Sequence, residues 1–176
     1  FLAVLEGASV MVCELMGAKL IEPVFGSSIY VWSAVLGVTL GGLMIGYFLG
    51  GWLSGKGKDN WVYLILALAG CLTAAMPSIS KPVMLSMIDE SVQYGSTMSL
   101  LVFMFPQLVL FGATSPLIIN KLNQNSGRAG KMAGSVYAIS TVGGIASTFF
   151  VGLYLLPEKG GIFTAGSFGI ALTLFA

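Results

Sequence analysis

The sequence predicts an all-α integral membrane protein, a single bundle of six transmembrane helices. Hydrophobic residues make up 56% of the chain and charged residues 9%, whereas about 25% of the residues of a soluble domain are charged. The mean hydropathy is +0.93, and several apolar runs reach the roughly 20 residues that cross a bilayer core. These runs lack the polar face that a helix of a soluble protein needs.

The positions of the apolar runs define one domain, 1–176, with six helices. We expect them at about 1–20, 30–54, 60–77, 95–120, 129–156 and 161–176. Proline removes a backbone donor, so Pro77 and Pro157 are expected to end the third and fifth helices. The stretch "SISKPVMLSMIDESVQ" between the third and fourth helices is too short and too polar to span, and it predicts a short interfacial helix.

Positive charge predicts the orientation of the bundle, because cytoplasmic loops carry an excess of lysine and arginine. One side has five such residues, and the other has three. The first set is Lys56, Lys58, Lys121, Arg128 and Lys131, and the second is Lys19, Lys81 and Lys159. This bias places both termini in the cytoplasm.

A ten-residue pattern occurs twice and indicates an internal repeat. The spacing S-x-Y-x-x-S-x-V-x-G describes Ser28 to Gly37 and again Ser135 to Gly144. The second helix would run inward and the fifth outward, so the two copies predict an inverted repeat of three helices plus three. A chance match between glycine-rich helices is the alternative, since the other helix pairs show no comparable identity.

Glycines recur every four residues along the second helix and predict close helix packing. They are Gly37 and Gly41, then Gly42, Gly46 and Gly50, and Gly143 and Gly144 take the same role in the second copy. In lipid, small residues at this spacing let two backbones approach. We favour packing within the chain over a dimer seam, and a transporter would use the same smooth strip for rocking.

Composition also excludes several classes of function. The net charge is +1, and no basic stripe suits a nucleic-acid partner. The chain has no histidine and two cysteines, so the usual ligands of zinc or haem are missing. We therefore expect no metal and no cofactor.

Three blocks of the sequence resemble a known family. "ELMGAKLIEPVFGSSIYVWSAVLGVTLGGLMIGYFLGGWLS", "GATSPLI" and "GRAGKMAGSVYAISTVGGIASTFFVGLYLLP" resemble the membrane portion of membrane-bound spermidine synthase-like proteins, which join a major-facilitator-like half to a cytoplasmic aminopropyltransferase. The resemblance implies a location in the inner or plasma membrane of a prokaryote and a link to polyamines. No strand, glycine-rich turn and helix unit for a nucleotide is present, so the chain as given is not expected to be an enzyme.

A wider resemblance concerns the major facilitator superfamily. Gly42 and Gly51 have the spacing of that family's signature between the second and third helices, and Lys56 falls at its basic position. The aspartate position holds Gly55, which removes the carboxylate of the cytoplasmic gate. Six helices would be half of such a transporter, so the resemblance implies a homodimer or a partner subunit.

The candidate ligand-binding residues are Glu6, Glu14 and Lys19 of the first helix and Gln107 of the fourth helix. Glu6 and Glu14 are the only acids within a predicted span, and a charge at the bilayer centre costs about 2.5–3.5 kcal/mol. Glu14 is expected either to bind a cation or a proton or to have a structural role, paired with Lys19 or with a cluster of backbone donors. For Glu6, we favour a structural role close to the cytoplasmic interface.

The fourth helix contributes a further candidate. Pro106 predicts a kink because it frees a carbonyl one turn earlier. Gln107 beside it offers both a donor and an acceptor. If the fourth helix is the counterpart of the first, Gln107 and Glu14 approach a common cavity near the midplane. A static kink satisfied by neighbouring helices is the alternative.

Two functions remain. The first is a half-facilitator domain that transports or binds a small cationic, polyamine-like solute. The second is a membrane anchor that holds a spermidine synthase-like enzyme or another partner at the cytoplasmic face.

Overall fold

The computed structural model describes residues 1–55, 61–123 and 129–175, and helices are the only regular elements in this part of the chain. The prediction of an all-α fold is therefore confirmed for the described residues. The elements are α1 (Leu2–Phe25), α2 (Ile29–Ser54), α3 (Trp61–Ser86), α4 (Val92–Phe103), α5 (Phe105–Asn123), α6 (Ala129–Phe150), the π-helical turn η1 (Val151–Leu155) and α7 (Leu156–Phe175).

Within the described residues, three helical stretches are long and apolar enough to cross a membrane. They are Ile29–Ser54, Trp61–Ser86 and Ala129–Phe175, and the bent pair α4 and α5 would make a fourth. The helix α1 is equally long but is not among them, since it carries four charged side chains: Glu6, Glu14, Lys19 and Glu22.

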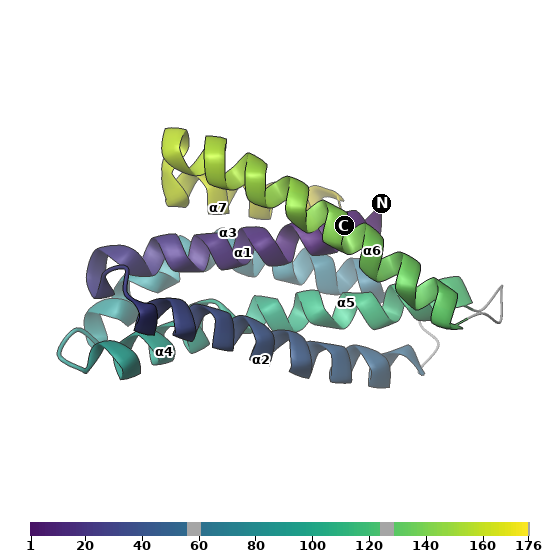
Figure 1. Ribbon diagram of the computed structural model, residues 1–176, viewed down its shortest axis with the longest axis horizontal. Helices are drawn as coiled ribbons and strands as arrows, with labels where there is room; N and C mark the ends of the chain where they lie inside the picture. Colours follow the sequence, from purple (N-terminus) through teal and green to yellow (C-terminus); the bar gives the residue numbers. More distant parts are fainter. Residues whose placement is uncertain (56–60, 124–128, 176) are drawn as a thin grey trace.

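The helices run back and forth along one common axis, and both ends of the chain lie at the same end of the bundle (Figure 1). The rings of Phe1 and Phe175 meet edge to face there, with centroids 6.2 Å apart. If α4 and α5 count as one pass, and α6 with η1 as another, the chain makes six passes.

The first helix is longer than predicted. It continues through Pro23 and ends at Phe25, instead of ending near residue 20. Gly26 adopts φ 76°, a conformation open to glycine, and its N–H donates to the Glu22 carbonyl over 2.8 Å. Ser28 then begins α2 by accepting a hydrogen bond from the Val31 N–H.

The prediction that Pro77 ends the third helix is wrong, and so is the separate interfacial helix. The helix α3 contains both Pro77 and Pro82 and continues to Ser86. Met76, Ser80 and Met84 are spaced four residues apart and all buried. Tertiary packing along this face therefore outweighs the loss of two backbone hydrogen bonds.

The predicted single helix at 95–120 is instead two helices that meet at a bend. The bend between α4 and α5 is 54°, and Met104 separates them. It lies beside Pro106, where the sequence predicted a kink. The Phe103 carbonyl at the break accepts a hydrogen bond from the Gln107 side chain.

The turn between the last two passes depends on a glycine instead of on Pro157. The backbone stays helical through η1 and past Pro157, so the prediction that Pro157 ends the helix is wrong. Gly160, at φ 76° and ψ 168°, breaks the helix and lets α7 turn back (Figure 1).

Three helix pairs form the bundle, and small residues lie at each crossing. They are α2 with α5, α1 with α6, and α3 with α7. A Cβ atom added to Gly112 would lie 3.2 Å from the Gly46 Cα, and one added to Gly70 would lie 2.9 Å from the Gly169 carbonyl oxygen. These distances mean that backbone packs on backbone, as at small-residue crossings of membrane helices.

The two copies of the repeated pattern lie in different surroundings. Val35 is fully buried, whereas its counterpart Val142 is 64% exposed. Gly37 has no neighbour within 4 Å of an added Cβ, whereas Gly144 packs on Met11 and Gly7. The matched residues therefore do not repeat the same contacts.

Lys56, Lys58 and Arg128, which contribute to the predicted orientation, lie outside the described residues.

Candidate functional site

Glu6 is the most deeply buried acid among the described residues. Only 2% of its surface is exposed. The Ser140 hydroxyl of α6 donates to the Glu6 Oε2 over 2.5 Å. The carboxyl group therefore links α1 to α6, and no lysine or arginine pairs with it in the part that the structure describes.

The crossing of α1 and α6 places Ser140 beside Glu6. A Cβ atom at Gly7 would overlap the Ser140 carbonyl, and one at Gly143 would overlap the Val4 carbonyl. A Cβ at Gly144, the next residue of α6, would lie 3.3 Å from the Gly7 carbonyl oxygen. Only glycine permits this approach, so Gly7 and Gly143 set the distance across which the serine reaches the carboxyl.

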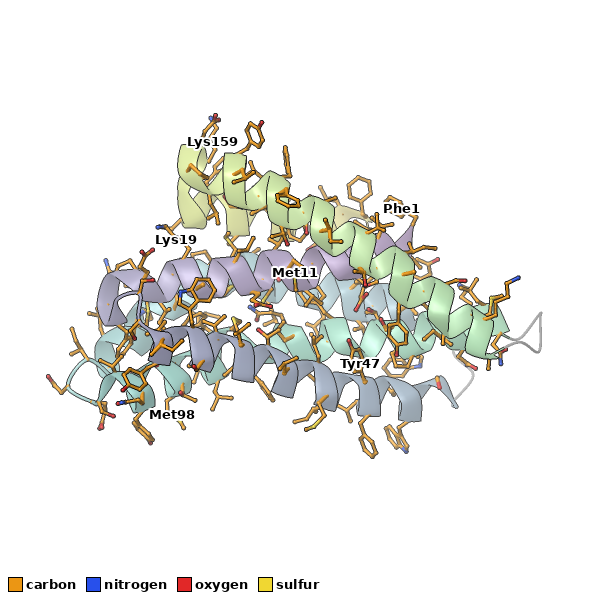
Figure 2. The ribbon with its side chains drawn as sticks, in the orientation of Figure 1. Phe1, Met11, Lys19, Tyr47, Met98 and Lys159 are labelled. Carbon is orange, nitrogen blue, oxygen red and sulfur yellow. The ribbon has the colours of Figure 1, made fainter. Side chains whose placement is uncertain are left out.

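Glu6 also lines a cavity of about 470 Å³ between α1, α2 and α6. Met11 of α1 and Tyr47 of α2, both labelled in Figure 2, line it as well. Tyr47 and Ser140 lie about two to three turns from the ends of their helices at Ser54 and Ala129, which is about 10–16 Å. Glu6 is therefore well inside the bundle and not at its rim.

The serine and threonine hydroxyl groups around the cavity are already committed as donors, and Tyr47 adds one further hydroxyl group. Thr141 donates to the Tyr137 carbonyl and Thr148 to the Gly144 carbonyl, each over 2.8 Å. Ser140 donates to Glu6. Each oxygen keeps free lone pairs, so these groups offer acceptors and one carboxyl group. A cation with N–H donors suits this set better than an anion does.

Glu14, which the sequence ranked first, lies elsewhere. It is only partly buried, it lines none of the cavities described here, and no hydrogen bond or ion pair reaches its carboxylate among the described residues. The suggested pair with Lys19 is not formed. The Lys19 Nζ lies 2.7 Å from the Glu22 Oε2 instead, and both side chains are about half exposed.

Gln107 hydrogen-bonds the backbone at the break between α4 and α5. It is 2% exposed, and its Nε2 donates to the Phe103 carbonyl over 2.9 Å. Gln107 and Glu14 are not lining residues of any one of the cavities found among the described residues. The hydrogen bond to Phe103 is the one that the static-kink alternative expects.

The predicted packing glycines divide into two groups. Gly42, Gly46 and Gly50 press on α5, and Gly143 and Gly144 press on α1. Gly37 and Gly41 line an open groove of about 510 Å³ between α2 and α4. The glycines of α2 therefore form a close helix crossing toward the C-terminal end of α2 and line a groove toward its N-terminal end.

Sequence reasoning did not predict that Glu6 is the more deeply buried acid of α1, and it did not identify Ser140 as its partner. One signal was available, because Ala3, Glu6, Gly7 and Val10 recur at the spacing of one buried helix face. This pattern does not say which helix packs against that face of α1.

No protein-family model, no curated protein and no solved structure matches this chain. Among the described residues, no group of three or more histidine, cysteine, aspartate or glutamate side chains could hold a metal ion.

Proposed function

We propose that the chain is a membrane-embedded bundle of six spans. Large apolar side chains face outward on several helices, with Phe48 77%, Leu64 62% and Val142 64% exposed. In water each would forgo about 1.5–3 kcal/mol of burial, whereas lipid accepts them. The charged helix α1 supports the same proposal, because it contacts all the other α-helices and 11 of its 24 residues are buried.

The helix pairs support an inverted repeat of three passes plus three, half of a facilitator-like fold. Numbered by pass, the second lies on the fourth, the first on the fifth and the third on the sixth. Exchanging the two halves converts the first of these pairs into the second and leaves the third unchanged, as a pseudo-two-fold axis requires. A second copy of the chain or a partner subunit would complete the fold.

In this proposal both termini are cytoplasmic, and cysteine labelling tests the orientation. In a background without Cys13 and Cys71, Asp89→Cys should react with a membrane-impermeant maleimide added outside intact cells, and Gly55→Cys should react only after permeabilisation. These positions lie in turns at opposite ends of the bundle. External labelling of Gly55→Cys alone would reverse the orientation.

For the bundle itself, we infer a domain that binds or transports a small cationic solute. One observation carries this proposal: a carboxyl group that is 2% exposed, and that accepts a hydrogen bond from the Ser140 hydroxyl, lines a cavity of about 470 Å³. A buried acid without a basic partner is expensive within a membrane and typically marks a substrate or ion pathway.

Calorimetry on protein in lipid nanodiscs tests this function. We expect wild-type protein to bind at least one of spermidine and phenylethylammonium saturably. Glu6→Gln keeps an acceptor for Ser140 but removes the charge, so it should abolish this binding while leaving the melting temperature nearly unchanged. Glu14→Gln is the matched control, because Glu14 lies on the same helix outside the cavity, and it should bind as the wild type does.

The anchor function is the second candidate, and two observations favour it. The break in α4–α5 is held by Gln107 within the chain, and Gly55 stands where a facilitator gate has aspartate. If neither amine binds to the wild type, or if both bind equally to Glu6→Gln, the anchor is favoured and the solute-binding proposal is wrong.

A further inference from the structure

The cavity beside Glu6 has one carboxyl group, and this limits how many positive charges it can bind. Glu6 is the only carboxylate and no basic side chain is among its lining residues. Within a low-dielectric site, a charge is tolerated only where an opposite charge compensates it. One carboxylate therefore compensates one ammonium group, and the further ammonium groups of a polyamine would be buried without a partner.

Much of the remaining surface of the cavity is apolar. Val10 and Met11 of α1, Leu43 of α2 and Ile145 of α6 line it. Such a wall gains from contact with a hydrocarbon body and gains nothing from a second charge. Its volume of about 470 Å³ falls within the range of about 300–1,000 Å³ typical of sites for small organic ligands.

Aromatic rings add a preference for cations over neutral ligands. Tyr47 of α2 and Phe149 of α6 both line the cavity. The face of an aromatic ring attracts an organic cation, and more strongly where water is excluded. The Glu6 carboxyl group and the lack of a basic side chain in the lining add to this preference, because both disfavour a carboxylate or phosphate ligand.

We propose that this cavity binds a monovalent organic ammonium ion, with one charged nitrogen on Glu6 and an apolar body against α1, α2 and α6. This inference rests on the proposed solute-binding function and narrows it, because it replaces the polyamine that the family resemblance implies. Glu14, further along α1 and outside the cavity, does not supply a second anionic contact.

Three probes test the proposal by calorimetry on protein in lipid nanodiscs. Phenylethylammonium has one charge and an apolar body, methylammonium has one charge and almost no body, and spermidine has three charges. We expect phenylethylammonium to bind about tenfold or more tightly than either of the others, the gain corresponding to the apolar area that it buries. Glu6→Gln measures the background from partition into lipid.

Two variants separate the outcomes. Glu14→Gln should leave the order of the three binding affinities unchanged. Leu43→Asn should weaken the binding of phenylethylammonium and leave the affinity for methylammonium unchanged. If spermidine binds most tightly of the three probes, and if its affinity falls in Glu14→Gln, the proposal of a monovalent ligand is wrong. A cation site that depends on Glu6 would remain. Equal binding of every probe to wild type and Glu6→Gln would overturn the cation site itself, and the narrower proposal with it.

Discussion

Replacing Gly46 with alanine should destabilise the protein by about 1–3 kcal/mol, the usual cost of overpacking. A Cβ atom at this position would lie 2.8 Å from the Gly112 Cα and 2.9 Å from the Ala113 amide nitrogen, and it would overlap the Val109 carbonyl. All three contacts are with backbone, so no side chain can rotate away. The helices α2 and α5 would have to separate along their whole crossing. Thermal unfolding of the purified protein in detergent measures the loss.

Gly37→Ala is the matched control on the same helix. Nothing lies within 4 Å of an added Cβ there, and alanine favours a helix over glycine by about 0.8–1.0 kcal/mol. Its melting temperature should therefore equal or exceed that of the wild type. Equal melting temperatures for Gly46→Ala and Gly37→Ala would contradict the close crossing of α2 and α5.

Ser140→Ala should cost about 1–3 kcal/mol, the cost of leaving a buried polar group without its hydrogen bond. The Ser140 hydroxyl makes the short bond to Glu6, and with 2% exposure the carboxyl group is shielded from bulk solvent. In the double variant Glu6→Leu/Ser140→Ala, both groups are gone, so the two losses should not add.

The repeated pattern supplies the control, since Ser33 is the counterpart of Ser140. Ser33 is exposed and makes no side-chain hydrogen bond in the described part of the chain. Ser33→Ala should change stability by less than about 0.5 kcal/mol. If Ser33→Ala and Ser140→Ala melt alike, the bond to Glu6 contributes nothing to stability.

Some features follow from local chemistry, and the sequence determines these by itself. Apolar runs of sufficient length specify helices, and the all-α fold follows. The i, i+4 spacing of Gly42, Gly46 and Gly50 specifies a smooth face, because 3.6 residues per turn put them on one side. Pro106 specifies a break in its own turn, and the bend beside it at Met104 is found there.

Only the tertiary structure decides where a proline does not end its helix. Pro77 has the same local chemistry as Pro106, yet α3 continues through it because Met76, Ser80 and Met84 pack along one buried face. The energy of that packing comes from other helices, which no window of sequence around Pro77 contains.

The two acids of α1 illustrate the same limit at the candidate site. Glu6 and Glu14 have the same side chain on the same helix, and the sequence ranked Glu14 first. Glu6 became the buried group because Gly7 and Gly143 bring α6 against that face of α1. Glu14 faces no such crossing. The sequence alone determines that α1 carries two costly charges, but only the packing of α6 on α1, between residues far apart in the chain, decides which of them is enclosed.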